Sequence, residues 1–318
     1  MEKKNRYRIY SDYLRGLYGE KVYKIPLNLP VTCPNRVGES NKGGCIFCGD
    51  EGAGFESLCQ DITVKQQLRT NMDYIYKKYK AKKFIAYFQN FTNTYLPIEQ
   101  FKNYINEVLC EEVVEIAVST RPDCIHSAYL EYLCEIQQKR VKNISVELGL
   151  QSVNYHTLKK INRGHSLAEF IDSILQIKKY GFTTCVHLIL NLPWDNMEDI
   201  IEDAKILSAL GVEQVKLHSL YIVKGTELGR IYEANEIELI DMEDYVDRVI
   251  TFLEYLDPSV VLQRLIGRAP QENTLFCNWG TSWWKIKDRI DEKMELLDSY
   301  QGKNFDYLQG KAVRHFFD

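Results

Sequence analysis

Residues 166–190 read SLAEFIDSILQIKKYGFTTCVHLIL and combine the signals of one helix with those of one strand. Ser166, followed three residues later by Glu169, forms a capping-box pattern, which marks the first turn of a helix. Apolar residues then recur on one helical face, and Gly181 suits the left-handed conformation that follows a last helical turn. The next run, residues 183–190, is short, apolar and rich in β-branched residues, as buried strands are. This stretch therefore predicts a helix that leads directly into a buried strand.

The same alternation of helix and strand extends over much of the chain. Asp195 with Glu198 forms a second capping-box pattern, and Gly211 suits the end of the helix that follows it. Predicted strands begin about every thirty residues, the spacing of βα units that build parallel sheets. We expect them at residues 21–29, 84–88, 113–118, 143–148, 183–190 and 214–220. Six parallel strands are too few for a complete eight-stranded barrel, so the sequence predicts an α/β fold with a partial, six-unit, TIM-like barrel.

The βα rhythm ends near residue 225, and the rest of the chain has a different pattern. It contains a predicted helix at residues 241–256, a short apolar run at 260–262 and the aromatic stretch WGTSWW at 279–284. We expect residues 1–225 to form the barrel domain, with a cysteine-containing loop at 33–48. Residues 226–318 are expected to form a C-terminal extension and a candidate substrate-binding region.

The overall composition excludes several classes of protein. With 45% hydrophobic and 26% charged residues among 318, the chain resembles ordinary soluble proteins, and no stretch is apolar enough to span a bilayer. Its 40 Lys and Arg against 44 Asp and Glu give a net charge of −4, so an RNA-binding surface must be a local patch. The N-terminus carries no secretory signal, and we expect a cytoplasmic location. Nine cysteines, an odd number, do not indicate a disulfide framework, which leaves metal binding or burial as their role.

Three of these cysteines lie in one Gly-rich loop, CPNRVGESNKGGCIFCG at residues 33–49. The two-residue gap between Cys45 and Cys48 lets neighbouring sulfurs converge, and the flexible loop brings Cys33 to the same metal centre. A structural zinc site would need a fourth ligand, which Cys59 can supply. A 4Fe–4S cluster held by three cysteines instead leaves one iron open for the amino and carboxylate groups of S-adenosylmethionine (SAM). Burial of three unrelated cysteines is a poor explanation, because Gly-rich loops rarely bury cysteines.

The motif CIFC at residues 45–48, with an aromatic residue before the last cysteine, resembles the signature of the radical SAM family. Five further motifs occur in the same order as in the radical SAM domain of the Elongator catalytic subunit: STRPD (119–123), VELGLQS (146–152), NRGH (162–165), HLILNLP (187–193) and KLHSLYIVKGT (216–226). Three more are similar to compact bacterial radical SAM proteins of the YhcC and YtqA (MnmL) type: SDYLRGLYGEKVYKIPLN (11–28), TCPNR (32–36) and YFQNFTNTY (87–95). The resemblance covers nearly the whole barrel.

The resemblance implies a 4Fe–4S cluster bound by Cys33, Cys45 and Cys48, with SAM beside it. Arg163 is expected to reach the SAM carboxylate, a pairing that suits a guanidinium, while Glu147 and Gln151 hold the ribose or amino group. The full set of expected cofactor-binding residues is Phe47, Gln89, Thr92, Asn93, Arg121, Glu147, Gln151, Arg163 and His187.

Two of these residues have structural alternatives. Glu147 can pair with Arg121 or Arg163 for charge balance alone, because buried charge pairs occur without catalysis. His187 can be a core histidine on a strand.

The family resemblance implies reductive cleavage of SAM to methionine and a 5′-deoxyadenosyl radical, which takes a hydrogen atom from the substrate. The likeness to the Elongator subunit and to the MnmL type implies tRNA modification at a wobble uridine, from 5-carboxymethylaminomethyl to 5-aminomethyl uridine. The acetyltransferase domain of the Elongator subunit has no counterpart here, which argues against an acetyl-CoA reaction. Expected partners are tRNA and an electron donor such as flavodoxin or ferredoxin, and neither DNA nor a membrane is expected.

Two further residues are candidates for catalysis. Lys224 can meet an anionic substrate, and Cys277 lies in LFCNWGTSWWK (275–285), an aromatic segment able to stack on a base. A solvated lysine and simple aromatic packing are the structural alternatives. Two other functions stay open: a radical SAM enzyme with another substrate, and a non-catalytic zinc-stabilised RNA-binding protein.

Overall fold

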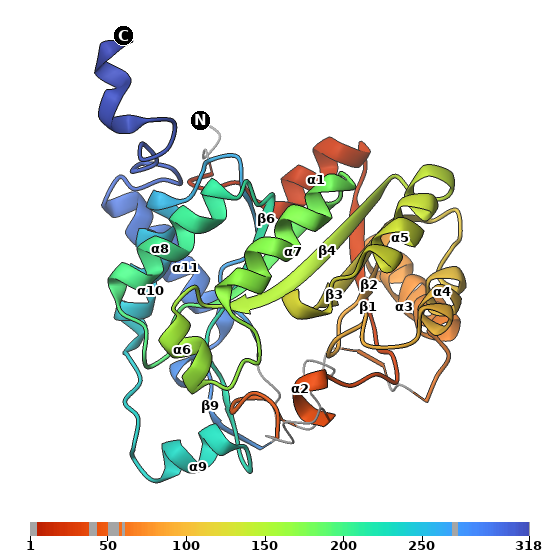
Figure 1. The fold of residues 1–318 in the computed structure, drawn as a ribbon, viewed down its shortest axis with the longest axis horizontal. Coiled ribbons are helices and arrows are strands. Elements are labelled where there is room, and N and C mark those ends of the chain that lie inside the picture. The colour runs from red at the N-terminus through yellow and green to blue at the C-terminus, as the bar shows by residue number, and fades with distance from the viewer. Residues whose placement is uncertain (1–4, 38–42, 50–56, 59–60, 269–272, 318) are drawn as a thin grey trace.

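The predicted strands form one parallel sheet. The computed structural model describes residues 5–37, 43–49, 57–58, 61–268 and 273–317, and within them the sheet order is β1-β2-β3-β4-β5-β6-β8 (Figure 1). All neighbouring strands are parallel. Their bounds are β1 (Val22–Leu27), β2 (Lys83–Phe88), β3 (Val113–Thr120), β4 (Asn143–Gln151), β5 (Thr183–Ile189), β6 (Gln214–His218) and β8 (Val261–Arg264). The α/β class and the partial TIM-like barrel are confirmed, and all six predicted strands are present.

The seventh strand, β8, was not predicted from the strand spacing. It runs parallel to β6, with Gln214 opposite Val261 and Val215 opposite Leu262. The connection between β6 and β8 contains β7 (Ile222–Val223), α9 (Glu227–Glu233) and α10 (Met242–Tyr255), and β7 pairs antiparallel with β9 (Thr274–Phe276). These insertions lengthen the connection and hide the βα spacing. The division at residue 225 stays a prediction, although a strand from beyond it joins the sheet.

Helices cover the outer face of the sheet, and α1 covers the inner face. Besides α9 and α10, the helices are α1 (Tyr10–Tyr18), α2 (Pro34–Val37), α3 (Val64–Tyr79), α4 (Ile98–Glu107), α5 (Ser127–Lys139), α6 (Tyr155–Lys160), α7 (Leu167–Lys179), α8 (Met197–Ala209) and α11 (Trp283–Leu296). Phe84 and Phe88 of β2 belong to the large core, whereas Ile85 and Tyr87 pack with Tyr18 of α1. Because successive side chains of a strand point to opposite faces, the outer apolar layer is separate from the interior of the half-barrel.

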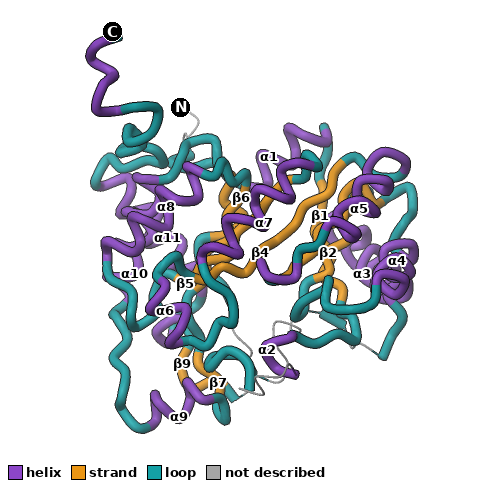
Figure 2. The backbone as a smooth tube through the Cα atoms, in the orientation of Figure 1, coloured by secondary structure: helices purple, strands orange, loops and turns teal. Residues whose placement is uncertain are grey.

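The interior of the half-barrel becomes polar toward the carboxyl ends of the strands. Alternation along β4, β5 and β6 places Glu147, His187 and Lys216 on the inward face, and His187 is the register partner of Lys216. The segments that follow the strands, including α2, α6 and the paired β7 and β9, gather at one end of the sheet (Figure 2). In parallel barrels this end carries the active site.

The helix caps largely follow the sequence patterns. Ser166 caps α7 in a reciprocal capping box, as predicted. The N-cap of α8 is Asn196 rather than Asp195, so the predicted capping box is displaced by one residue. Asp195 instead accepts a hydrogen bond from Thr157 Oγ1 at 2.5 Å, which joins the loop before α8 to α6.

Two buried carboxyl groups support the loop that follows β4. Asp203 Oδ1 accepts the backbone N–H of Val153 at 2.9 Å, while Oδ2 of Asp203 and Oδ2 of Asp195 lack hydrogen-bond partners in the described part of the chain. Burial raises the pKa of Asp195 to about 6 and raises the pKa of Asp203 well above its ordinary value. In the unfolded chain both carboxyl groups lose their protons near pH 4, whereas in the folded chain they keep them to a higher pH. The free energy of unfolding therefore falls as the pH rises above about 4.

We therefore expect Asp203→Asn to increase the free energy of unfolding at pH 8 by about 1–3 kcal/mol, and by less at pH 4. Asparagine keeps an oxygen for the Val153 N–H but carries no charge to bury. Urea unfolding at the two pH values measures the difference. Asp172→Asn, on the exposed face of α7, is the matched control and should change stability by no more than about 0.5 kcal/mol. An equal loss of stability in Asp203→Asn at both pH values would contradict this explanation.

Candidate active site

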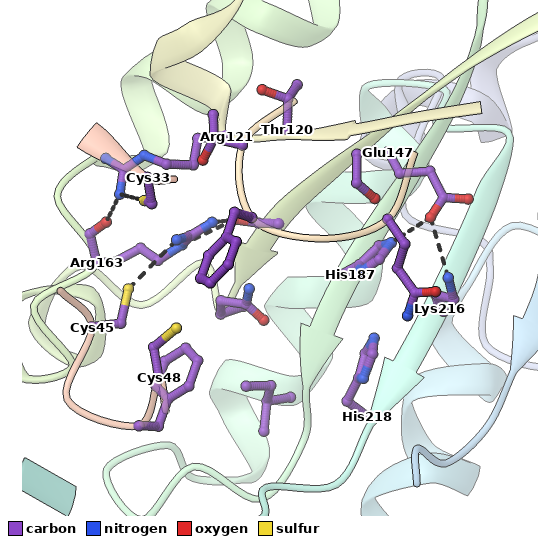
Figure 3. Close-up of a pocket in the computed structure, with 18 of the residues that line it drawn as sticks. Cys33, Cys45, Cys48, Thr120, Arg121, Glu147, Arg163, His187, Lys216 and His218 are labelled. Atoms are coloured by element: carbon purple, nitrogen blue, oxygen red, sulfur yellow. Dashed lines mark hydrogen bonds and ion pairs between the residues drawn. The ribbon is translucent and has the colours of Figure 1, made fainter. Parts of the chain in front are cut away.

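A cavity at the carboxyl end of the half-barrel brings most of the predicted residues together. The three cysteines line it, as do eight of the nine expected SAM-binding residues: Phe47, Gln89, Thr92, Arg121, Glu147, Gln151, Arg163 and His187. Figure 3 shows the cysteines on one side and Lys216 and His218 on the other. We call Cys33, Cys45 and Cys48 the sulfur end of the cavity, and Lys216, His218 and Arg264 its basic end.

Each sulfur of the sulfur end faces a different arginine. The Nη1 to Sγ distances are 3.7 Å for Arg121 and Cys33, 3.5 Å for Arg163 and Cys45, and 3.7 Å for Arg36 and Cys48. Guanidinium N–H groups donate strong hydrogen bonds to anionic acceptors. Three cationic groups directed at three sulfurs therefore fit thiolates that bind an anionic iron–sulfur cluster. The proposed fourth zinc ligand, Cys59, lies outside the described residues.

The arginines are themselves fixed by local contacts. Arg121 forms a two-point pair with Asp123, with Nε–Oδ1 at 2.8 Å and Nη2–Oδ2 at 2.7 Å. Burial opposes its charge, but Asp123 outweighs burial and raises the pKa of Arg121. Arg163 donates from Nε to the carbonyl oxygen of Gly149 at 3.1 Å, and a Cβ on Gly149 would lie 2.7 Å from Arg163 Nη2. A larger residue at position 149 would therefore force the Arg163 guanidinium to shift from this position.

Glu147 lies at the centre of a buried network of hydrogen-bond donors, two of which are lysines. Its carboxylate contacts Lys24 Nζ and accepts hydrogen bonds from His187 Nε2 at 2.8 Å, Lys216 Nζ at 3.2 Å and Gln263 Nε2 at 3.2 Å. Burial alone would raise the pKa of Glu147, but Lys216, Lys24 and His187 together hold it well below its ordinary value. The suggested pairing of Glu147 with Arg121 or Arg163 is therefore wrong, because its partners lie on β1, β5, β6 and β8.

The two histidines of the cavity are neutral near pH 7. Burial, reinforced by Lys216, lowers the pKa of His187 to about 4 even though Glu147 opposes the shift. Burial and Arg264 hold the pKa of His218 well below its ordinary value. The two rings stack with their centroids 5.2 Å apart. As a neutral imidazole, His187 thus donates a hydrogen bond from Nε2 to the Glu147 carboxylate, and His218 Nδ1 accepts one from Arg264 Nη2 at 2.8 Å.

Three predicted site residues, Asn93, Lys224 and Cys277, are not among the described residues that line the cavity. Asn93 is fully buried, and its Nδ2 donates to the carbonyl oxygens of Phe88, Asn90 and Ser119, so it shapes the loop after β2. Lys224 is exposed just after β7. Cys277 is half-buried just after β9. Any role of these residues toward a ligand stays a prediction.

Sequence reasoning missed several residues of the site. Lys24 is the one cation in the apolar strand β1, and that pattern is the signal that could have identified it. Gln263 and Arg264 lie on β8, a strand that the sequence pattern did not predict, so their position at the cavity was not predicted either. Phe91 lines the cavity with a φ of 52°, in the left-handed region that glycine adopts more readily.

Within the described ranges, no helix has both the length and the apolar composition needed to cross a membrane.

Known proteins are similar to this chain in sequence or in fold. YtqA of Bacillus subtilis (strain 168) is 34% identical over 309 residues, which are 97% of this chain and 95% of YtqA, and this confirms the predicted resemblance to the YhcC and YtqA type. A tRNA uridine(34) acetyltransferase of Methanocaldococcus infernus is 26% identical over 170 residues, 52% of this chain and 30% of that protein. The structure of Elp3 from Methanocaldococcus infernus with its N-terminal residues 1–46 deleted has a TM-score of 0.66 at 17% identity, covering 88% of this chain and 64% of that chain, and shows the same fold.

Two family models account for most of the described site. The model of the Radical SAM superfamily matches residues 31–207, which include the sulfur end, and the model of the Radical_SAM C-terminal domain matches residues 212–296, which include the basic end. The match favours the 4Fe–4S interpretation of the three cysteines over the zinc site. The chain therefore belongs to the radical SAM superfamily, whose enzymes use a 4Fe–4S cluster and SAM.

Proposed function

We propose that this radical SAM enzyme acts on a modified wobble uridine of tRNA and converts 5-carboxymethylaminomethyl uridine to 5-aminomethyl uridine. The observation that carries the proposal is the two-ended cavity, in which the sulfur end suits the cofactors and the basic end suits an anionic substrate. The similarity of half the chain to a tRNA uridine(34) acetyltransferase supports a wobble uridine, and so does the MnmL-type resemblance of the motifs.

The proposed reaction balances with SAM as the only oxidant. The carboxymethyl carbon beside the secondary amine loses a hydrogen atom and one further electron, which gives an imine. Water adds to the imine, the carbon–nitrogen bond breaks, and glyoxylate and the primary amine of 5-aminomethyl uridine are released. Overall, the substrate would lose two electrons and two protons; the cleavage of SAM to methionine and 5′-deoxyadenosine would take up the electrons and one proton, and the other proton would be released to solvent.

The residues of the cavity have separate tasks in this proposal. When bound, the cluster and SAM supply a 5′-deoxyadenosyl radical that abstracts hydrogen. Cys33, Cys45 and Cys48 would hold the cluster. The groups that would hold SAM are Phe47, Gln89, Thr92, Arg121, Gln151 and Arg163. Glu147, whose carboxylate is already contacted by Lys24, His187, Lys216 and Gln263, would position His187 and Lys216 instead.

The proposal also includes two partners that contact the protein outside the cavity, an electron donor and the tRNA. Radical SAM enzymes need a reductant, and we assign this role to a flavodoxin or a ferredoxin. Lys224 and Cys277 follow the paired strands β7 and β9, and we assign them contacts with the RNA outside the cavity.

Nucleoside mass spectrometry of tRNA from a deletion strain tests the substrate. The strain should accumulate 5-carboxymethylaminomethyl uridine and lose 5-aminomethyl uridine and any product made from it. The wild-type gene should restore the nucleosides, and a Cys48→Ala gene should not. Unchanged nucleosides in the deletion strain would reject this substrate. SAM cleavage by the purified enzyme without any change in tRNA would instead indicate a radical SAM enzyme with another substrate.

A further inference from the structure

Arg264 ends β8 at the basic end of the cavity and is incompletely paired. Its side chain hydrogen-bonds only to the His218 imidazole within the described ranges, with Nη2 2.8 Å from Nδ1. Its Nε is buried and has no hydrogen-bond partner there. It forms no ion pair with any described carboxylate. A buried guanidinium N–H without an acceptor is costly, so this group is suited to a ligand that supplies one.

The charges around Arg264 also leave room for an anion. Glu147 is the only carboxylate among the described residues that line the cavity. It is already in contact with Lys24 and Lys216. Burial lowers the pKa of Lys216 to about 8, with Glu147 opposing the shift, so the lysine is still mostly charged near pH 7. Lys24 and Lys216 thus already share this one carboxylate, and Arg264 adds a third cation that no described carboxylate pairs with. A bound anion would reduce the imbalance.

We propose that Arg264, with neutral His218 beside it, binds the carboxylate of the carboxymethyl group on the substrate uridine. This assignment rests on the proposed function and identifies Arg264 as the residue that selects the carboxymethylated substrate. The Nε–H and one Nη2–H lie along one edge of a guanidinium, and such an edge holds a carboxylate through two parallel hydrogen bonds. The second Nη2–H goes to His218. Arg264 therefore distinguishes a carboxymethylated uridine from one that lacks the acid.

Two other anions can accept the same pair of hydrogen bonds from a guanidinium, namely the carboxylate of SAM and an RNA phosphate. The arginines at the sulfur end, Arg121 and Arg163, already provide guanidinium groups beside the cysteines. Figure 3 places His218, the partner of Arg264, on the opposite side of the cavity from Cys33 and Cys45. The substrate carboxylate is thus the anion that the position of Arg264 favours, and the other two become outcomes of the test.

The test compares two anticodon stem-loop RNAs that differ only in the carboxylate. One carries 5-carboxymethylaminomethyl uridine at the wobble position and the other carries 5-methylaminomethyl uridine. Their dissociation constants are measured with the reconstituted holoenzyme, for the native chain, Arg264→Met, Arg264→Lys and the control Arg268→Met. Arg268 is exposed, lies over the Trp283 ring and does not line this cavity. Iron content and SAM affinity are measured on every variant to establish that each one is folded.

We expect the native chain to prefer the carboxylated RNA, and Arg264→Met to weaken its binding at least about 30-fold. The same variant should leave the affinity for the methylaminomethyl RNA and for SAM unchanged. Arg264→Lys should retain part of the preference, because lysine keeps the positive charge but cannot form two parallel hydrogen bonds with one carboxylate. Arg268→Met should behave like the native chain.

Three outcomes would overturn the assignment. Equal weakening of both RNAs would place Arg264 against the phosphate backbone, and weakened SAM binding would place it in the cofactor site. Absence of any preference in the native chain would remove carboxylate recognition altogether. If the native chain prefers the carboxylated RNA but does not convert it, the proposed reaction fails while the assignment of Arg264 stands.

Discussion

Cys48→Ala should abolish SAM cleavage, with a fall in 5′-deoxyadenosine formation of at least about a thousandfold after anaerobic reconstitution. Two remaining thiolates do not close the three-cysteine site, and the electron needed for cleavage then has no path to SAM. The native chain should bind about four irons and show the brown colour of an iron–sulfur protein. The variant should show little of either. Iron analysis, absorbance and product quantification measure these effects together.

Cys134→Ala is the matched control for this experiment. Cys134 is half-buried on α5, where Gln138 Nε2 donates to its sulfur at 3.5 Å, and it lies outside the cavity. Its removal should leave iron content and cleavage unchanged. Full iron content and full activity in Cys48→Ala would mean that the three cysteines do not form the metal site. A colourless native protein that contains zinc would restore the structural-zinc alternative.

Glu147→Gln should destabilise the fold by about 3–5 kcal/mol at pH 7, the range seen when one partner of a buried ion pair is removed. The side chain of Glu147 is fully buried, and its loss leaves Lys24 and Lys216 without a counter-charge in the half-barrel. Tyr87, whose ring lies 4.2 Å from Lys24 Nζ and 4.5 Å from Lys216 Nζ, offers only a partial replacement. Urea unfolding of the native chain and the variant measures the change in free energy.

The pH dependence separates this charge effect from simple repacking. The pKa of Glu147 is held well below its ordinary value, so its stabilisation is present above about pH 4.5 and is lost as the pH falls toward the folded-state pKa. The difference between the native chain and Glu147→Gln should therefore shrink in acid. Adding Lys216→Met to Glu147→Gln should recover part of the loss, because it removes one unpaired cation. Glu99→Gln, which disrupts an exposed pair with Lys102 on α4, is the control and should change stability by less than about 1 kcal/mol. A pH-independent loss in Glu147→Gln would contradict the electrostatic explanation.

Strand and helix positions were predictable where local patterns are strong. The run at 183–190 and the helix capped by Ser166 depend on short-range features, namely side-chain periodicity and the capping of unpaired N–H groups. Strand β8 was missed because four residues without a regular βα spacing carry little local signal. The cap of α8 was displaced by one residue because Asp195 and Asn196 are both good cap residues, and only the contact of Asp195 with Thr157 decides between them.

By itself, the sequence determined the αβ repeat and predicted three cysteines that can converge on one metal centre, since residue spacing limits both the secondary structure and the ligands that can converge. Only the tertiary structure decided the partners of Glu147, which come from strands spread between residues 24 and 263. It also decided which arginines face the sulfurs and that Arg264 points into the cavity. The physical reason is that charge balance in a buried site is set by distances across the folded sheet, and residues remote in the sequence reach those distances only when the strands close into a half-barrel.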